Sequence, residues 1–276
     1  MHFSMTFLQG LILFCAAVLG GTLNSVAGGG SFICFPALVF TGLPAIPANA
    51  TNSVALWPGA VASVGAYRRE LAVQERILLV LLICTSLLGG VLGALLLLLT
   101  PPGIFVRLVP YLLLMATLLF TFSGPITARL RGQGQATAPT LGEEGQATAP
   151  MLEKVRLSVP VLVGISFAQL VISVYGGYFG GGIGILMLAT LAMMGMKDIH
   201  VMNALKTVLA SCINGVAVIT FIFAGLVVWP QAILMIIGAI IGGYGGAYYA
   251  RKIQQKWVRL FVIVVGFTMT FLFLRA

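Results

Sequence analysis

The sequence has few charged residues: 15 Lys and Arg and 6 Asp and Glu among 276, or 8% of the chain. A soluble domain is about one-quarter charged, and those residues cover its surface. Hydrophobic residues make up 60% of this chain, and its mean hydropathy is +1.10. This composition excludes a cytosolic enzyme, a secreted disulfide scaffold and a disordered chain. It favours an all-α polytopic membrane protein.

Residues that carry catalytic or metal chemistry are also scarce. There are two histidines and four cysteines, and Cys15, Cys34, Cys84 and Cys212 lack any metal-ligand spacing. We interpret the cysteines as small buried apolar residues. The sequence has no Walker A, HExxH or Ser-His-Asp arrangement, and none of the six acids lies in the middle of an apolar segment. It therefore predicts no catalytic residue, no metal and no cofactor.

The net charge is +9, which by itself is compatible with a nucleic-acid partner. The cations, however, are scattered at the ends of apolar segments and do not form one basic face. These cations are better interpreted as loop residues that orient a membrane protein. We therefore expect the lipid bilayer, and no nucleic acid, as a partner.

Apolar segments occur in two groups of five. The first covers 5–27, 31–43, 53–67, 77–99 and 104–122, and the second covers 157–178, 183–196, 205–228, 230–250 and 257–275. Residues 123–156 contain half of the acids and two copies of Gly-Gln-Ala-Thr-Ala-Pro. We predict a first transmembrane repeat over 1–122, a flexible cytoplasmic linker over 123–156, and a second transmembrane repeat over 157–276.

The two groups resemble one another in sequence. Residues 28–30 are three glycines, as are residues 180–182, and Asn49-Ala50 matches Asn203-Ala204. Further matches follow in the same order and with nearly the same spacing, the last pairing 105–108 with 257–260. An ordered series of this kind indicates an internal repeat.

Basic residues indicate how the second repeat is oriented. The region 68–76 contains three arginines, whereas the matching loop around 229–230 contains no cation. Conversely, the loop 100–103 is neutral, and its counterpart 251–256 contains three cations. Cytoplasmic loops are enriched in Lys and Arg, so this exchange predicts two inverted-topology repeats in the cell inner membrane.

Each repeat contains one short segment after a glycine cluster. At about 1.5 Å per residue, segments 31–43 and 183–196 cannot span a bilayer alone, so we predict a short broken helix in each half. The N–H groups and positive dipole end at such a helix start suit an anion. Close helix packing is the alternative role for these glycines. The residues predicted to bind substrate here are Gly28, Gly29, Gly30, Ser31, Gly180, Gly181 and Gly182.

Polar residues open the third segment of each half. Lys206 is the cation expected within a span, where a charge is costly unless it is paired or functional. We predict that Lys206 binds a small anion; the alternative is a side chain that extends to the cytoplasmic interface. The residues expected to hydrogen-bond the same anion are Asn49, Thr51, Asn52, Ser53, Asn203 and Thr207.

Other polar residues near these positions are candidates for lining a cavity. Their alternative roles are hydrogen bonds to unwound backbone or between helices. These candidates are Asn24, Ser25, Gln169, Ser173, Tyr175, Tyr178, Ser211 and Asn214.

The stretches LNSVAGGGSF (23–32), NATNS (49–53), GGYFGGG (176–182) and MNALK (202–206) together resemble the sulfite exporter TauE/SafE family. The resemblance covers both halves and leaves out the linker 123–156. It implies a bacterial cytoplasmic-membrane permease for sulfite, thiosulfate or small organosulfonates such as sulfoacetate.

We therefore expect an inner-membrane permease that moves a small sulfur oxyanion or organosulfonate by alternating access around a mid-membrane site. An interior-negative potential contributes about 2.3 kcal/mol per charge per 100 mV to the outward movement of an anion, which favours export. An anion channel and a non-transporting scaffold for cofactor or oxidase assembly are the alternatives. Self-association is left open.

Overall fold

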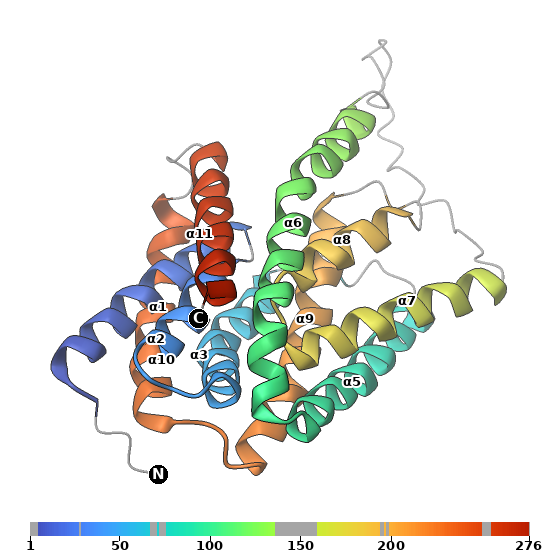
Figure 1. The fold of residues 1–276 in the computed structure, drawn as a ribbon. Helices are drawn as coiled ribbons and strands as arrows, with labels where there is room; N and C mark the ends of the chain where they lie inside the picture. Colours follow the sequence, from blue (N-terminus) through green and yellow to red (C-terminus); the bar gives the residue numbers. More distant parts are fainter. Residues whose placement is uncertain are drawn as a thin grey trace.

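The computed structural model describes residues 5–27, 29–66, 71, 76–135, 159–193, 196, 199–249 and 255–275. Over these residues it contains ten α-helices and no strand, which confirms the all-α fold (Figure 1). The first half holds α1 (Phe7–Ala27), α2 (Ser31–Phe40), α3 (Ala45–Ala66), α5 (Arg76–Leu99) and α6 (Pro102–Gln135). The second half holds α7 (Val159–Tyr178), α8 (Ile183–Met193), α9 (Ile199–Phe223), α10 (Trp229–Tyr249) and α11 (Gln255–Arg275).

Each predicted apolar segment corresponds to one helix, but the third helix of each half begins earlier than expected. α3 begins at Ala45 rather than residue 53, and α9 begins at Ile199 rather than residue 205. Pro47 fits in the first turn of α3, where its missing N–H costs no helical hydrogen bond. The polar residues that were expected to open these helices therefore lie one or more turns inside them.

α6 extends into the segment that was predicted to be a linker. It continues to Gln135, whereas the linker was expected from residue 123. Residues 136–158 lie outside the described part of the chain. The division into 1–122, 123–156 and 157–276 therefore remains a prediction.

The outer surface of the helix bundle is apolar. On α5, the exposed fractions of Leu88, Leu92 and Leu99 are 62%, 52% and 81%. Within the described residues, four helices contain stretches long and apolar enough to cross a membrane, namely Phe7–Asn24, Arg76–Leu99, Pro102–Thr121 and Val201–Phe223. A water-soluble protein rarely exposes apolar surface on this scale, whereas lipid covers it at no cost.

The prediction that all four cysteines are buried is wrong for two of them. Cys34 is buried and Cys212 is half-buried, but Cys15 and Cys84 are exposed. In a soluble protein an apolar segment faces the core, and that rule underlies the prediction. In a membrane protein the same segment also has an apolar outer face, so hydropathy alone does not distinguish the two faces.

Helix contacts in the first half recur in the second. α1 packs along α10 and α5 packs along α7, so each of these pairs joins a helix of one half to a helix of the other (Figure 1). The contact of α5 with α9 has its counterpart in α10 with α3, and α1 with α2 in α7 with α8. α3 contacts its own counterpart α9, and α6 contacts α11. This pattern is consistent with the predicted repeat.

Glycines allow the two long helix pairs to approach closely. A Cβ on Gly93 of α5 would overlap the backbone oxygen of Val174 on α7. A Cβ on Gly242 of α10 would likewise overlap the backbone oxygen of Val18 on α1. These two glycines therefore serve close helix packing.

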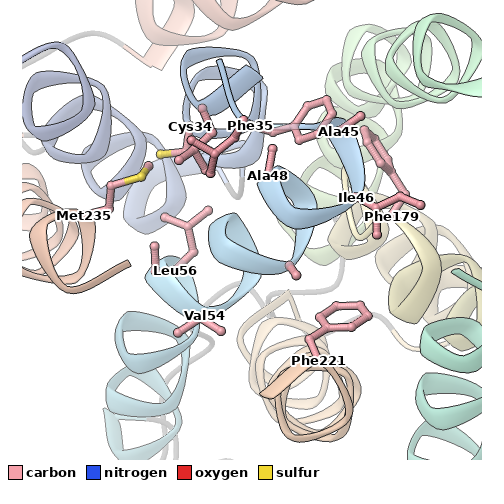
Figure 2. Packing of buried hydrophobic residues seen from close by; sticks show 14 of the residues in the cluster. Cys34, Phe35, Ala45, Ile46, Ala48, Val54, Leu56, Phe179, Phe221 and Met235 are labelled. Atoms are coloured by element: carbon pink, nitrogen blue, oxygen red, sulfur yellow. The ribbon is translucent and has the colours of Figure 1, made fainter. Parts of the chain in front are cut away.

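The largest apolar cluster surrounds α3. It includes Phe35 of α2, Phe221 of α9 and Met235 of α10, and Figure 2 shows these side chains around the α3 ribbon. Because α3 contacts helices of both halves, this cluster holds the two repeats together at the centre of the bundle.

Candidate functional site

The helix break in the second half is built from glycines in an unusual backbone conformation. Between α7 and α8, Gly180 has φ +79° and Gly182 has φ +77°. L-amino acids with a side chain rarely adopt these angles, so the break requires glycine. In the first half, Gly30 has φ −57°, which is helical, and Gly28 lies outside the described residues. The predicted break is therefore distinct before α8, and the two halves differ at this point.

Two aromatic residues fix the second break in place. The Tyr175 hydroxyl donates a hydrogen bond of 2.7 Å to the backbone oxygen of Gly181. Tyr175 was one of the polar residues expected to line a cavity or to hydrogen-bond unwound backbone, and the second role is confirmed. The ring of Phe179 packs edge-on against Phe35 of α2, with centroids 5.6 Å apart. The Phe35–Phe179 contact joins the second break to the short helix of the first half.

α3 reaches the same break through Asn49. The Asn49 Nδ2 group donates to the backbone oxygen of Tyr178, the last residue of α7, at 3.1 Å. Asn49 is 1% exposed and lies in the interior between the two halves. Ser53 donates to the Asn49 backbone oxygen at 2.9 Å, so its hydroxyl bonds within α3.

Asn52 and Lys206, which match one another in the two repeats, each contact the first turn of a short helix. Asn52 Nδ2 donates to the Ser31 hydroxyl, at the first residue of α2, at 3.2 Å. The Lys206 side chain lies against Gly184, the second residue of α8, where an added Cβ would be 3.2 Å from Lys206 Cδ. The two repeats therefore build the same contact with different chemistry.

The Lys206 contact places a positively charged side chain near the positive end of the α8 dipole. Its ammonium donates to Asn203 Oδ1 at 3.1 Å, and its stem lies beside the positive dipole end of α8. All six acids of the chain fall outside the described residues, so none of the described side chains neutralises this charge. A lysine packed against a helix N-terminus is an arrangement that an anion stabilises.

The residues that form both breaks fall within the match to one protein family. The model of the family described as "Sulfite exporter TauE/SafE" matches residues 13–273. The chain belongs to this family. The resemblance noted from the sequence is confirmed.

Three relatives are similar to this TauE/SafE member over nearly its whole chain. A "Probable membrane transporter protein" of Haemophilus influenzae is 30% identical, covering 94% of this chain and 92% of the relative. "Probable membrane transporter protein ORF9" of a Sinorhizobium species is 26% identical, covering 92% and 88%. "Probable membrane transporter protein YfcA" of Escherichia coli K12 is 24% identical, covering 94% and 87%. No solved structure matches the chain. The protein is a multi-pass membrane transporter.

Two of the predicted ligand residues of this TauE/SafE member make other contacts. Thr51 Oγ1 accepts a hydrogen bond of 3.1 Å from the backbone N–H of Val228, in the connection between α9 and α10. Thr207 donates to the Asn203 backbone oxygen at 2.7 Å, the counterpart of the Ser53 bond in α3. The structure therefore brings Asn52 and Lys206 to the short helices and Asn49 to the end of α7, and it directs Thr51 to a loop.

The predicted cavity-lining residues fall into two groups. Gln169 donates to the Ser86 hydroxyl at 2.8 Å and to Ser173 at 3.3 Å, so these residues join α7 to α5. Tyr178 points its hydroxyl toward Thr100, at 3.4 Å. These hydrogen bonds are contacts between helices or along α7.

The remaining candidates lie nearer the breaks. Asn214 Oδ1 is 3.7 Å from the position of a Cβ on Gly180, and Asn24 Cβ is 3.2 Å from that on Gly30. Ser211 is buried on α9, and its backbone oxygen accepts a 3.1 Å hydrogen bond from Trp57 Nε1 of α3. The Ser25 side chain lies outside the described residues.

Sequence reasoning missed Trp57 and the connection before α10. Trp57 joins α3 to α9, and its ring also lies against Gly215. A tryptophan within an apolar segment suggests only packing, so no local pattern identifies its partner. Similarly, nothing near Val228 in the sequence indicates that its N–H meets Thr51.

Proposed function

We propose that this transporter exports a small sulfur oxyanion or organosulfonate across the cell inner membrane by alternating access. The observation that supports this most directly is the packing of Lys206 against Gly184 at the start of α8. Two positive features, an ammonium and a helix N-terminus, adjoin there, and no acid is among the described residues. A bound monoanion would remove the repulsion between them.

The binding groups in this proposal come from both repeats. The N–H groups of the first turn of α8 and the Lys206 ammonium hold the negative charge. Asn49 and Asn52, which reach the end of α7 and the start of α2 from α3, adjoin the remaining oxygens of the substrate. Tyr175 keeps the break in the geometry that exposes these N–H groups, because it holds the Gly181 carbonyl.

The interleaved helices suggest how access could alternate. α1 packs with α10, and α5 with α7, so each long pair contains one helix from each half. A rocking motion of these pairs around α3 and α9 would open the central site to one side and then the other. The glycines at the contacts in both pairs have no side chain that would block such sliding.

Export is the proposed direction because the membrane potential drives it. With the cytoplasm negative, outward movement of one negative charge is favoured by about 2.3 kcal/mol per 100 mV. A facilitator therefore needs no coupled ion for efflux, whereas uptake would need one.

The test is flux of radiolabelled sulfite in proteoliposomes, with a potassium-diffusion potential of either sign. We expect saturable, protein-dependent flux that is faster when the potential pulls the anion out. Protein-free liposomes measure the background, and thiosulfate, sulfoacetate and acetate serve as competitors. Absence of protein-dependent flux for every sulfur anion would contradict the proposal. Non-saturating flux with single-channel currents would identify an anion channel instead.

A further inference from the structure

Three buried amide oxygens of the described residues lack hydrogen-bond donors, and two of them, on Asn49 and Asn52, belong to α3. Within the described part of the chain, neither Asn49 Oδ1 nor Asn52 Oδ1 accepts a hydrogen bond. Both residues are almost fully buried, at 1% and 2% exposed. A buried polar atom without a partner is costly and rare in native proteins, so each oxygen calls for a donor that is absent from the described protein atoms.

The orientation of Asn49 is fixed by its partner. Its side chain faces the backbone oxygen of Tyr178, which can only accept, so the amide nitrogen must point there. The Asn49 oxygen must consequently point away from that carbonyl. This oxygen is therefore a true acceptor, and it does not arise from a reversed assignment of the amide group.

The two oxygens belong to the proposed substrate site. Asn49 contacts the last residue of α7, immediately before the break at 179–182, and Lys206 contacts α8 immediately after it. Asn52 contacts the first residue of α2, whose Phe35 packs on Phe179 within the same break. The cation and the two neutral acceptors therefore reach the elements that flank this break.

We infer that the transported anion carries its own hydrogen-bond donor, an O–H or N–H group that binds to Asn49 Oδ1 or Asn52 Oδ1 while Lys206 and α8 bind the negative charge. This inference rests on the proposed function and narrows its substrate. Two sources supply this chemistry: a singly protonated oxyanion such as hydrogensulfite, and an organosulfonate with a hydroxyl or amino group. An anion without a donor would bring its own lone pairs against these buried acceptors, which is unfavourable.

The first experiment compares two sulfonates of equal charge as inhibitors of sulfite flux in proteoliposomes of the full-length protein. Ethanesulfonate lacks a donor, and 2-hydroxyethanesulfonate adds one hydroxyl to the same skeleton. One hydrogen bond to a buried neutral acceptor corresponds to roughly a three- to tenfold difference in binding. We expect 2-hydroxyethanesulfonate to inhibit more strongly by that factor.

The second experiment tests the protonated-oxyanion source. Sulfite flux is measured at fixed total sulfite on both sides of the second pKa of sulfurous acid, with protein-free liposomes subtracted to remove permeation of sulfur dioxide. Flux that follows the hydrogensulfite concentration supports this source. The same pH series with labelled 2-hydroxyethanesulfonate, which does not titrate there, corrects for titration of the protein.

Two variants link the preference to the residues. Asn52→Leu and Asn49→Leu each remove one acceptor with a side chain of similar size, and at least one of them should abolish the preference for 2-hydroxyethanesulfonate over ethanesulfonate. Retention of the full preference in both Asn52→Leu and Asn49→Leu would contradict the assignment.

The wild-type measurements remain decisive if a variant fails to fold. Equal inhibition by the two sulfonates, with sulfite flux indifferent to its protonation, would overturn the inference and leave the anion transporter intact. Loss of all protein-dependent anion flux would instead contradict the proposed function itself.

Discussion

The side chain of Lys206 on α9 lies against Gly184 in the first turn of α8. In the first repeat Asn52, the counterpart of Lys206, donates a 3.2 Å hydrogen bond to Ser31, the first residue of α2. Both repeats thus bring this position to the first turn of a short helix, as a neutral amide in one and as a lysine in the other. A site with opposite chemistry at its two ends can hold a ligand that is itself asymmetric.

Enlarging Gly184 should weaken anion binding. In Gly184→Ala the new methyl group would be 3.2 Å from Lys206 Cδ, so the lysine stem must shift by a few tenths of an ångström. We expect the KM for sulfite to rise about threefold, equivalent to roughly 0.6 kcal/mol, with the protein still folded. Gly164→Ala on α7 is the matched control, since nothing lies within 4 Å of its added Cβ. An unchanged KM in Gly184→Ala would argue against Lys206 as a ligand.

Removing the Tyr175 hydroxyl should loosen the second break. Tyr175→Phe keeps the ring and loses the 2.7 Å hydrogen bond to Gly181, which holds the unwound backbone in place. We expect sulfite flux to fall several-fold, because α8 no longer presents its first N–H groups in a fixed geometry. Tyr111→Phe on the exposed face of α6 is the control and should transport normally. Equal flux in the two variants would mean that the hydroxyl is dispensable.

Gln169 and Ser86 should contribute to stability and leave substrate affinity unchanged. Their 2.8 Å hydrogen bond joins α7 to α5 in the interior. A double-mutant cycle with Gln169→Leu and Ser86→Ala should give a coupling energy of about 0.6 kcal/mol, typical of hydrogen bonds between membrane helices. Thermal unfolding in detergent measures the coupling, and sulfite flux measures the KM. A raised KM in Gln169→Leu would instead place this residue in the substrate pathway.

Enlarging the packing glycines should separate the long helix pairs. Gly93→Ala and Gly242→Ala each place a methyl group onto the backbone oxygen of the partner helix. Overpacking of this kind costs about 1–3 kcal/mol, so we expect Tm to fall by several degrees in both variants. Gly103→Ala, whose Cβ meets nothing within 4 Å, should keep the wild-type Tm. A similar loss in the two variants is expected, since they occupy corresponding contacts of the two repeats.

The sequence predicted the helices well because hydropathy determines which segments enter a membrane. The polar run Asn49–Ser53 was expected to open the third segment, since such residues disfavour an apolar span. It lies inside α3, where distant residues bind several of its polar groups: the Asn49 amide nitrogen bonds to Tyr178, and Thr51 bonds to Val228. Partners so distant in the chain leave no local signal. Local pattern therefore indicates the helices, but not the turn at which each polar side chain finds its partner.

The candidate site was predicted in part, for a related reason. Glycine clusters and a lysine within a span are visible in the sequence, and the structure brings Lys206 to the helix that follows the second cluster. The roles of Gln169 and Ser173 could not be distinguished from sequence, because a polar residue facing a cavity and one facing Ser86 have the same helical spacing. The exposed Cys15 and Cys84 illustrate the same difficulty for apolar faces.

Sulfite flux through Lys206→Met in proteoliposomes, at concentrations spanning the wild-type KM, tests most directly whether the Lys206 ammonium binds the transported anion. Methionine keeps the length of the stem against Gly184 and removes the ammonium. The control is Arg107→Met, which removes an exposed cation from α6. If Lys206 binds the anion, we expect at least a tenfold loss of kcat/KM in Lys206→Met, corresponding to about 1.4 kcal/mol, and wild-type flux in the control. Wild-type kcat/KM in a folded Lys206→Met protein would contradict anion binding by Lys206.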